Sequence, residues 1–210
     1  NSKNIFKYPF IAKRIFKYVS KNNINIVHIR SRGPAWISSF LQTNKIKTVS
    51  TFHNIYGGDS IMKKFYNKRM AKVNYIISIS DYVKKEISNK YNIHPDKIFV
   101  INRGIDTDFF DDDVNANDKK IFLDKHNIAD SQKILLYPGR ITEWKGQYQF
   151  ISQIEKINMR GRVILFAGDT SNISHTNSLK SEIKNKNLID KCKILGPLND
   201  HDLKIAYSLS

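Results

Sequence analysis

The sequence predicts an α/β fold built from two parallel sheets, and two observations lead to this expectation. Short apolar runs recur along the 210 residues, and each is followed by a segment whose apolar residues have helical spacing. Several runs are continuously apolar, as in Tyr75-Ile76-Ile77-Ser78-Ile79, which is typical of strands buried on both faces. Strands that alternate with helices in this way form right-handed units with parallel strands.

The individual elements follow from these runs and from local signals at their ends. The expected strands span 24–29, 47–52, 75–80, 98–102, 133–137, 162–167 and 193–195. The expected helices span 10–22, 34–42, 60–72, 81–90, 147–157, 177–187 and 200–208. Ser80 or Asp81 can cap one helix, and Asn199 or Asp200 the last, because their side-chain oxygens accept a free backbone N–H. Pro34 suits a first helical turn.

A polar segment at 106–120 separates two groups of elements and is interpreted as a linker. The sequence therefore predicts a first domain over residues 1–115 and a second over 116–210. Three aspartates, Asp111, Asp112 and Asp113, lie in this linker. Such carboxylates can bind a divalent metal, but we expect no metal because they follow no strand end.

The chain starts without an initiator methionine and ends inside an apparent helix, so we expect truncation at both ends.

Composition limits the class of protein without identifying it. The chain is 40% hydrophobic and 26% charged, and no apolar run approaches the roughly 20 residues that span a bilayer, so it is expected to be globular. The net charge of +16 favours anionic partners, although an AT-rich genome would give the same excess of lysine. Cys192 is the only cysteine and is interpreted as a strand residue rather than a nucleophile.

One turn combines glycines with basic side chains. The segment Gly139-Arg140-Ile141-Thr142-Glu143-Trp144-Lys145-Gly146 lies between an expected strand and an expected helix. Such a turn directs backbone N–H groups and the positive helix end at one point, which suits a phosphate. Arg140 can bind phosphate oxygens in a bidentate manner, and Lys145 adds a mobile charge. The alternative is an ordinary turn with a solvated basic pair.

Five segments in order resemble the motifs of one family. They are Thr51-Phe52-His53-Asn54, the runs 77–83 and 98–109, Tyr137-Pro138-Gly139-Arg140 with Lys145-Gly146, and Leu165-Phe166-Ala167-Gly168-Asp169. Together they resemble glycosyltransferase family 4, retaining enzymes of the GT-B fold, which has two Rossmann-like domains. The resemblance runs from about Ile24 to the end of the chain. Segments 28–36 and 144–147 resemble a proteobacterial subgroup tied to cell-envelope glycans.

The chain departs from the family pattern at three places. The family's Asn-Gly-Ile-Asp is Arg103-Gly104-Ile105-Asp106 here, and the second glycine after Gly168-Asp169 is replaced by Thr170-Ser171. The family's Glu-X7-Glu segment would lie beyond Ser210, and its first glycine-rich loop before Asn1. Both domains are therefore expected to be incomplete, and the fragment alone inactive.

The resemblance implies an activity and a set of roles. The enzyme would move a sugar from a UDP-, GDP- or ADP-linked donor to an envelope glycan or a lipid-linked acceptor, with retention and without metal or other cofactor. Arg140 and Lys145 would stabilise the leaving diphosphate, and His53 would face the interdomain cleft near the transferred sugar. The residues expected to line the nucleotide pocket are Gly139, Gly146, Gly168, Asp169 and Gly196.

Acceptor and membrane contacts are also expected from the first domain. Arg30 and Arg32 follow a strand and are candidates for binding an acceptor phosphate, with solvated surface arginines as the alternative. The amphipathic basic segment 10–19 can lie on an anionic membrane or simply cover the sheet. The expected location is cytoplasmic, with peripheral contact at the inner face of the cytoplasmic membrane.

Three other functions compete with sugar transfer. A nucleotide-sugar epimerase of the same fold ranks lower because its pattern lacks the Gly139–Gly146 signature. The net charge suggests a nucleic-acid-binding module, but the lysines are scattered and no nucleic-acid partner is expected. A non-catalytic scaffold is the third alternative, since the acidic donor-sugar segment is missing from these residues.

Overall fold

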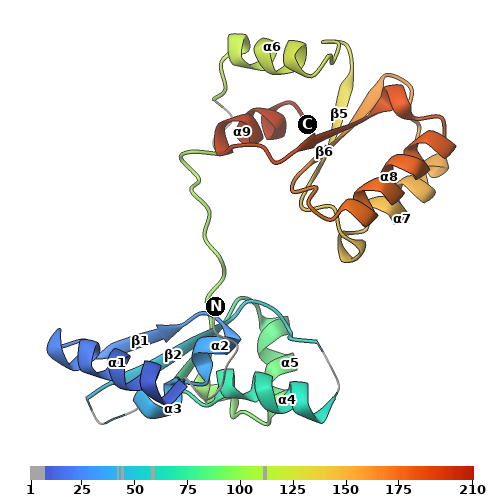
Figure 1. Cartoon of the computed structure of the whole chain (residues 1–210). Helices are drawn as coiled ribbons and strands as arrows, with labels where there is room; N and C mark the ends of the chain where they lie inside the picture. The colour runs from blue at the N-terminus through green and yellow to red at the C-terminus, as the bar shows by residue number, and fades with distance from the viewer. Residues whose placement is uncertain (1–7, 42, 44, 58–59, 111–112) are drawn as a thin grey trace. The chain divides into compact units, whose positions relative to one another are not determined.

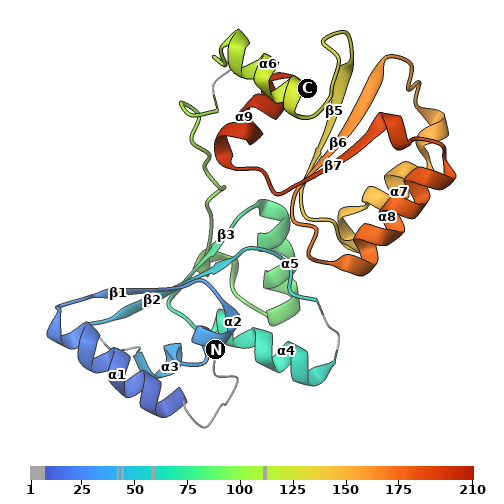
Figure 2. The same cartoon turned by 45° about the horizontal axis from the view of Figure 1, so that its top comes forward.

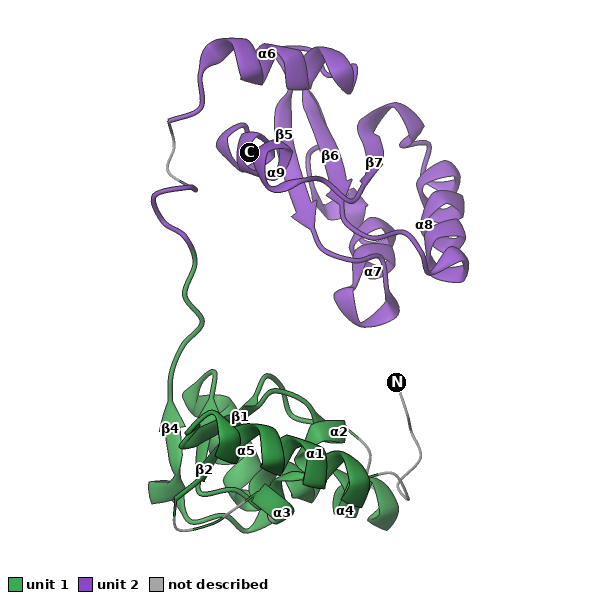
Figure 3. Ribbon diagram, turned by 60° about the vertical axis from the view of Figure 1, so that its left-hand side comes forward, with its two compact units in different colours: residues 1–105 green, residues 106–210 purple. Residues whose placement is uncertain are grey.

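The computed structural model describes residues 8–41, 43, 45–57, 60–110 and 113–210. The chain divides into two compact units, Asn1–Ile105 and Asp106–Ser210, and each is described by itself (Figure 3). Each unit contains one sheet, with the strand order β1-β2-β3-β4 in unit 1 and β5-β6-β7 in unit 2. Every pair of neighbouring strands is parallel, which confirms the predicted α/β fold class.

In the described part of unit 1, short strands of one sheet lie beside helices (Figure 1). The strands are β1 (Ile26–Ile29), β2 (Lys47–Phe52), β3 (Tyr75–Ser78) and β4 (Ile98–Val100). The helices are α1 (Tyr8–Lys21), α2 (Arg32–Ala35), α3 (Ser38–Leu41), α4 (Ile61–Lys68) and α5 (Asp81–Tyr91), with 3-10 turns η2 (Arg69–Ala71) and η3 (Pro95–Lys97). Phe52, Ile76 and Ile98 are buried in one cluster with Ile87 of α5, which fixes α5 against the sheet.

Unit 2 is a sheet with helices on both faces (Figure 2). Its strands are β5 (Lys133–Pro138), β6 (Arg162–Ala167) and β7 (Cys192–Gly196). Its helices are α6 (Ala116–Lys125), α7 (Gln147–Ser152), α8 (Ile173–Asn185) and α9 (Asp200–Ser208), with 3-10 turns η4 (Glu143–Lys145), η5 (Ile154–Lys156) and η6 (Ile189–Lys191).

The central strand β6 explains this arrangement because its residues alternate between two cores. Ile164 and Phe166 pack in the cluster that contains residues of α7 and α8. Val163 and Leu165 pack in the cluster that contains residues of α6 and α9. A strand buried on both faces must be apolar, and all residues from Val163 to Ala167 are apolar and buried.

The predicted strands are present, whereas several helices differ from the prediction. The helix expected at 34–42 is two short helices, α2 and α3, because Ser38 Oγ donates to the carbonyl of Ala35 at 2.7 Å at the break. The helix expected at 147–157 ends at Ser152, whose hydroxyl donates to the Gln149 carbonyl at 2.8 Å, and η5 follows.

The segment interpreted as a linker contains the start of a helix that the sequence did not predict. Helix α6 begins at Ala116, where the Asn115 side chain caps it by accepting from the N–H of Asp118 at 2.8 Å. Its apolar side is small: Phe122 and Leu123 are its buried residues. Asp111 and Asp112, two of the aspartates considered for metal binding, lie outside the described residues.

Two further features bear on function. None of the helices in the described part of the chain is long and apolar enough to cross a bilayer. Cys192 is buried in β7, and burial raises the pKa of its thiol to about 11, so the thiolate is disfavoured at neutral pH. This supports the interpretation of Cys192 as a strand residue.

Candidate active site at the strand ends

In unit 2, three loops meet at the carboxyl edge of the sheet, where parallel α/β sheets bind ligands. The Gly139 N–H donates to the carbonyl of Ala167 at 2.7 Å, and the Gly168 N–H donates to the carbonyl of Gly196 at 2.8 Å. The Ile141 N–H donates to the carbonyl of Asp169 at 2.9 Å. The predicted positions at 139, 168, 169 and 196 are therefore neighbours, although they are separated in sequence.

Gly168 sets how closely the first two loops approach. Its φ is +158°, and a Cβ added there would lie 2.2 Å from the backbone oxygen of Gly139. No side chain fits in that space, so glycine is required at this position. The backbones of the two loops are in direct contact as a result.

The basic loop after β5 is fixed on both sides by hydrogen bonds. The Tyr137 hydroxyl donates to the Lys145 carbonyl at 2.6 Å. Gln147, which is 1% exposed, donates through Nε2 to the carbonyls of Arg140 at 3.0 Å and Gly139 at 3.4 Å. Gly146 turns the chain into α7 with a φ of +79°, a conformation that favours glycine. The loop is thus held in one shape before any ligand arrives.

The two predicted cations of this loop have different neighbours. The Lys145 side chain folds back over Gly139, where its Cδ and Cε would contact an added Cβ at 3.7 Å. Its Nζ lies 4.7 Å from the centre of the exposed Trp144 ring. Arg140 is exposed and close enough to Asp169 for its charge to lower the pKa of that carboxyl. Neither cation belongs to an ion pair within the described residues.

Asp169 is held by the residues that replace the family's second glycine. The backbone N–H of Ser171 donates to one oxygen of its carboxylate at 2.8 Å, and the Ser171 hydroxyl donates to the other at 2.9 Å. These bonds, the backbone one first, lower the pKa of Asp169. Asp169 is therefore ionised and oriented at neutral pH, and it can accept hydrogen bonds from hydroxyl groups.

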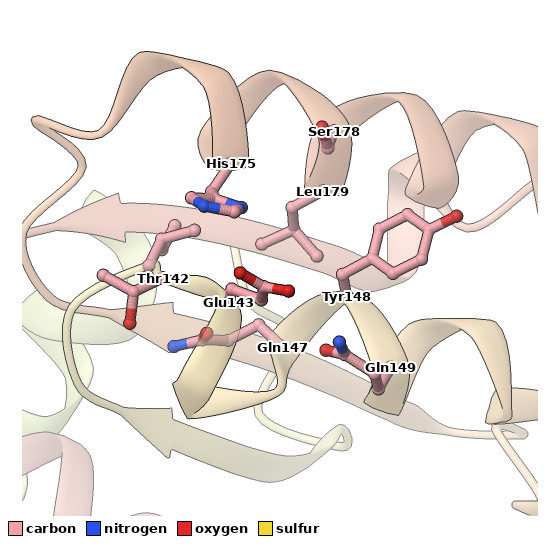
Figure 4. Close-up of a pocket in the computed structure, with 9 residues that line it drawn as sticks. Thr142, Glu143, Gln147, Tyr148, Gln149, His175, Ser178 and Leu179 are labelled. Carbon is pink, nitrogen blue, oxygen red and sulfur yellow. The ribbon is translucent and has the colours of Figure 1, made fainter. Parts of the chain in front are cut away.

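A pocket of about 290 Å³ lies between the basic loop and α8. In Figure 4, His175 and Leu179 of α8 lie over Glu143 and Gln147. Thr142 and Tyr148 also line it. None of the predicted nucleotide-site residues is among its lining residues, so this pocket is a separate hollow on the helical side of the loop.

In unit 1, His53 directly follows β2 and contacts a residue far away in sequence. Arg103 Nη2 lies 3.0 Å from His53 Nδ1. The pKa of His53 is lowered, first by burial and then by the charges of Arg103, Arg30 and His28. His28 in turn lies with Nε2 2.7 Å from Thr51 Oγ1. His53 is thus kept neutral among positive neighbours.

Arg32, one of the two candidates for binding an acceptor phosphate, contacts residues of its own unit. Its guanidinium lies 4.9 Å from the centre of the Tyr56 ring, and its Nη1 donates to Asn67 Oδ1 at 3.3 Å. The Tyr56 hydroxyl hydrogen-bonds to the backbone of His53. Arg32 therefore supports the loop that carries His53.

The contact between Arg103 and His53 was not predicted. The only signal in the sequence was the departure from the family pattern at Arg103.

Comparison with known proteins agrees with the geometry of both units. The sequence model described as Glycosyltransferase Family 4 matches residues 1–109, and the one described as Glycosyl transferases group 1 matches residues 118–210. The O-antigen chain mannosyltransferase RfbU of Salmonella typhimurium is 25% identical over 173 residues, which are 80% of this chain and 44% of that protein.

Solved structures show the same architecture. The crystal structure of a glycosyltransferase from Rickettsia africae is 34% identical with a TM-score of 0.86, covering 100% of this chain and 56% of that one. HepE of Anabaena, solved in complex with UDP-glucose, is 15% identical with a TM-score of 0.75, covering 91% of this chain and 52% of that one. The latter likeness concerns the fold alone.

The chain spans about half the length of these proteins, between 44% and 56%. Because one family model covers residues 1–109 and a second glycosyltransferase model covers most of the rest, the chain belongs to Glycosyltransferase Family 4 and has the GT-B fold.

Proposed function

We propose that the complete protein transfers a sugar from a nucleotide-sugar to a cell-envelope glycan or a lipid-linked acceptor, with retention of configuration and without a metal ion. Family membership supports sugar transfer, and the similarity to an O-antigen mannosyltransferase supports an envelope acceptor. The proposal places the protein in the cytoplasm, where nucleotide-sugars are made available to such enzymes, with peripheral contact to the membrane.

The observation that carries this proposal is the fixed basic loop beside the Gly168-Asp169 turn. Sugar transfer breaks a bond to a diphosphate, and negative charge grows on that group in the transition state. Cations held in place stabilise the transition state more than the ground state. Arg140 and Lys145 lie on a loop whose backbone is fixed by Gln147 and Tyr137, so this backbone needs no reorganisation when the charge develops.

Four other residues are assigned roles in the proposed reaction. The proposal assigns the contact with the diphosphate to the backbone of Gly139 and Gly146, since glycine allows a ligand to approach the main chain. Asp169 is ionised and accepts from hydroxyl groups of the nucleotide or sugar. His53 donates to a hydroxyl of the transferred sugar through its ring nitrogen, in keeping with its neutral state.

The proposal is tested by measuring turnover in the full-length protein. UDP-, GDP- and ADP-sugars are offered with an envelope lipid extract, and the anomeric configuration of the product is read by NMR. In Lys145→Ala we expect kcat to fall at least about 100-fold, as for the loss of one charge-stabilising group.

The matched control is Lys180→Ala, which removes an exposed lysine from α8 in the same unit. It is expected to leave kcat unchanged. Wild-type kcat in Lys145→Ala, or a product of inverted configuration, would contradict the proposal.

A further inference from the structure

A cluster of basic side chains lies at the carboxyl edge of the sheet in unit 1. Arg30 directly follows β1, His53 directly follows β2, and Arg103 lies shortly beyond β4. The strands are parallel, with Ile29 opposite Ser50, Phe52 opposite Ser78, and Ser78 opposite Val100. Residues that follow these strands therefore share one edge of the sheet.

Arg103 determines which nitrogen of His53 carries hydrogen. A guanidinium only donates, so Nδ1 of His53 is the acceptor in the 3.0 Å contact with Arg103 Nη2. The neutral ring then carries its hydrogen on Nε2. Arg103 is thus a positioning residue for the ring, and it leaves Nε2–H as a donor beside two guanidinium groups.

No carboxylate among the described residues forms an ion pair with the arginines of this cluster. The charges of Arg103, Arg30 and His28 all act on His53, and all act in the same direction. Among the described residues, no ion pair involves Arg30 or Arg103. Arg32, in contrast, has partners in Tyr56 and Asn67. Converging like charges repel each other, and an anion at this edge would remove that repulsion.

We propose that Arg30 and Arg103, beside His53, form a binding site for a phosphate group carried by the acceptor. The two guanidinium groups offer several donors to a group with several acceptor oxygens, and guanidinium matches phosphate geometry in a bidentate manner. This inference rests on the proposed function, because it assigns the phosphate to the acceptor rather than to the donor. A phosphorylated sugar and a lipid-linked diphosphate both present this chemistry.

The test follows the ring signals of His53 by NMR while inorganic phosphate is added to the full-length protein at constant ionic strength. The His53 signals are assigned by comparison with His53→Gln. We expect phosphate to shift these signals in a saturable way and to raise the pKa of His53, because an anion offsets the neighbouring charges. Chloride at the same ionic strength is expected to do neither.

Two variants and a matched control test the residues. In Arg103→Gln and in Arg30→Gln we expect phosphate affinity to fall at least about tenfold, because each variant loses one charge-assisted hydrogen bond to the phosphate. Arg103→Gln is also expected to raise the pKa of His53 in the absence of phosphate, which a purely structural role would not predict. The control Arg14→Gln removes an exposed arginine from α1 in the same unit and is expected to bind phosphate as the wild type does.

Two further ligands identify the source of the phosphate. Tighter binding of glucose 6-phosphate than of inorganic phosphate supports a phosphorylated sugar, and tighter binding of farnesyl diphosphate supports a lipid-linked acceptor. The inference is overturned if phosphate leaves the His53 signals unmoved, or if Arg103→Gln and Arg30→Gln bind it like the wild type. UDP-, GDP- and ADP-sugar turnover is measured in parallel, so failure of the phosphate site is distinguished from failure of the proposed function.

Discussion

At the scale of single residues, Gly168 and Gly139 show how the absence of a side chain shapes the candidate site. The two loops approach so closely that a Cβ on Gly168 would lie 2.2 Å from the Gly139 oxygen. The same approach places Arg140 near Asp169. The position of the basic loop therefore depends on Gly168, although this residue has no side chain that could contact a substrate.

Gly168→Ala is expected to destabilise unit 2 by at least about 2 kcal/mol, because both the backbone conformation and the contact with Gly139 are unfavourable. The matched control is Gly161→Ala, where φ is +64° but a Cβ would have open space around it. That variant is expected to cost about 1 kcal/mol. Urea unfolding measures both; equal losses would show that the close approach has no energetic importance.

Residue-level prediction from sequence is most direct where a motif is local. Gly139, Arg140, Lys145 and Gly146 lie within one turn, and their spacing alone places them together. Arg103 and His53 are separated by 50 positions, and their contact depends on the order of the strands. No local pattern contains that information, so the sequence identified His53 but not its partner.

At the scale of elements, the strands were easier to predict than the helices. A strand such as β6 is apolar from Val163 to Ala167 because both of its faces are covered, and this signal is strong. Helix α6 was missed because its buried residues are Phe122 and Leu123, too few to give a helical period. The breaks after α2 and after α7 depend on hydroxyl groups that bond to nearby carbonyls, which apolar spacing does not report.

Helix α1 combines a buried side with an exposed aromatic and basic side. Tyr8, Ala12 and Val19 are buried, whereas Phe10 is 75% and Tyr18 64% exposed. It therefore covers part of unit 1, and the exposed side carries lysines and an arginine as well as aromatic rings. Such a surface suits peripheral contact with anionic lipid, which is part of the proposed function.

Phe10→Ala is expected to weaken binding of the full-length protein to anionic liposomes about tenfold, because one buried aromatic side chain is lost from the lipid contact. Cosedimentation at low salt measures the binding. Tyr82→Ala on α5 removes an aromatic ring of similar exposure, 66%, and serves as the control that should bind normally. If neither variant differs from the wild type, or the wild type does not bind, α1 is a covering helix only.

At the scale of the whole molecule, the pH dependence of stability follows from one histidine in each unit. The pKa of His53 and that of His126 both lie below the ordinary value of 6.5, in each case first because of burial. Around His126, Lys125 and Lys193 lower the pKa further, while Asp202 raises it. In the unfolded chain both histidines take up protons at a higher pH than in the folded chain.

The free energy of unfolding is therefore expected to fall as the pH is lowered from about 7.5 to about 5.5. The contribution of the two histidines is complete above 6.5 and is lost as the pH falls through their folded pKa values. Urea unfolding at a series of pH values measures this slope. In a variant with both His53→Gln and His126→Gln the slope should be smaller; an unchanged slope would assign the effect to other groups.

The account as a whole depends on side-chain cations taking the place of a metal ion at the diphosphate of the donor. Calorimetric titration of the full-length protein with UDP, GDP and ADP in the presence of EDTA tests this most directly. We predict that one of these nucleotides binds without metal, and that Arg140→Ala and Lys145→Ala each weaken its binding at least about tenfold. Binding that requires Mg²⁺, or that is unchanged in both variants, would contradict the account.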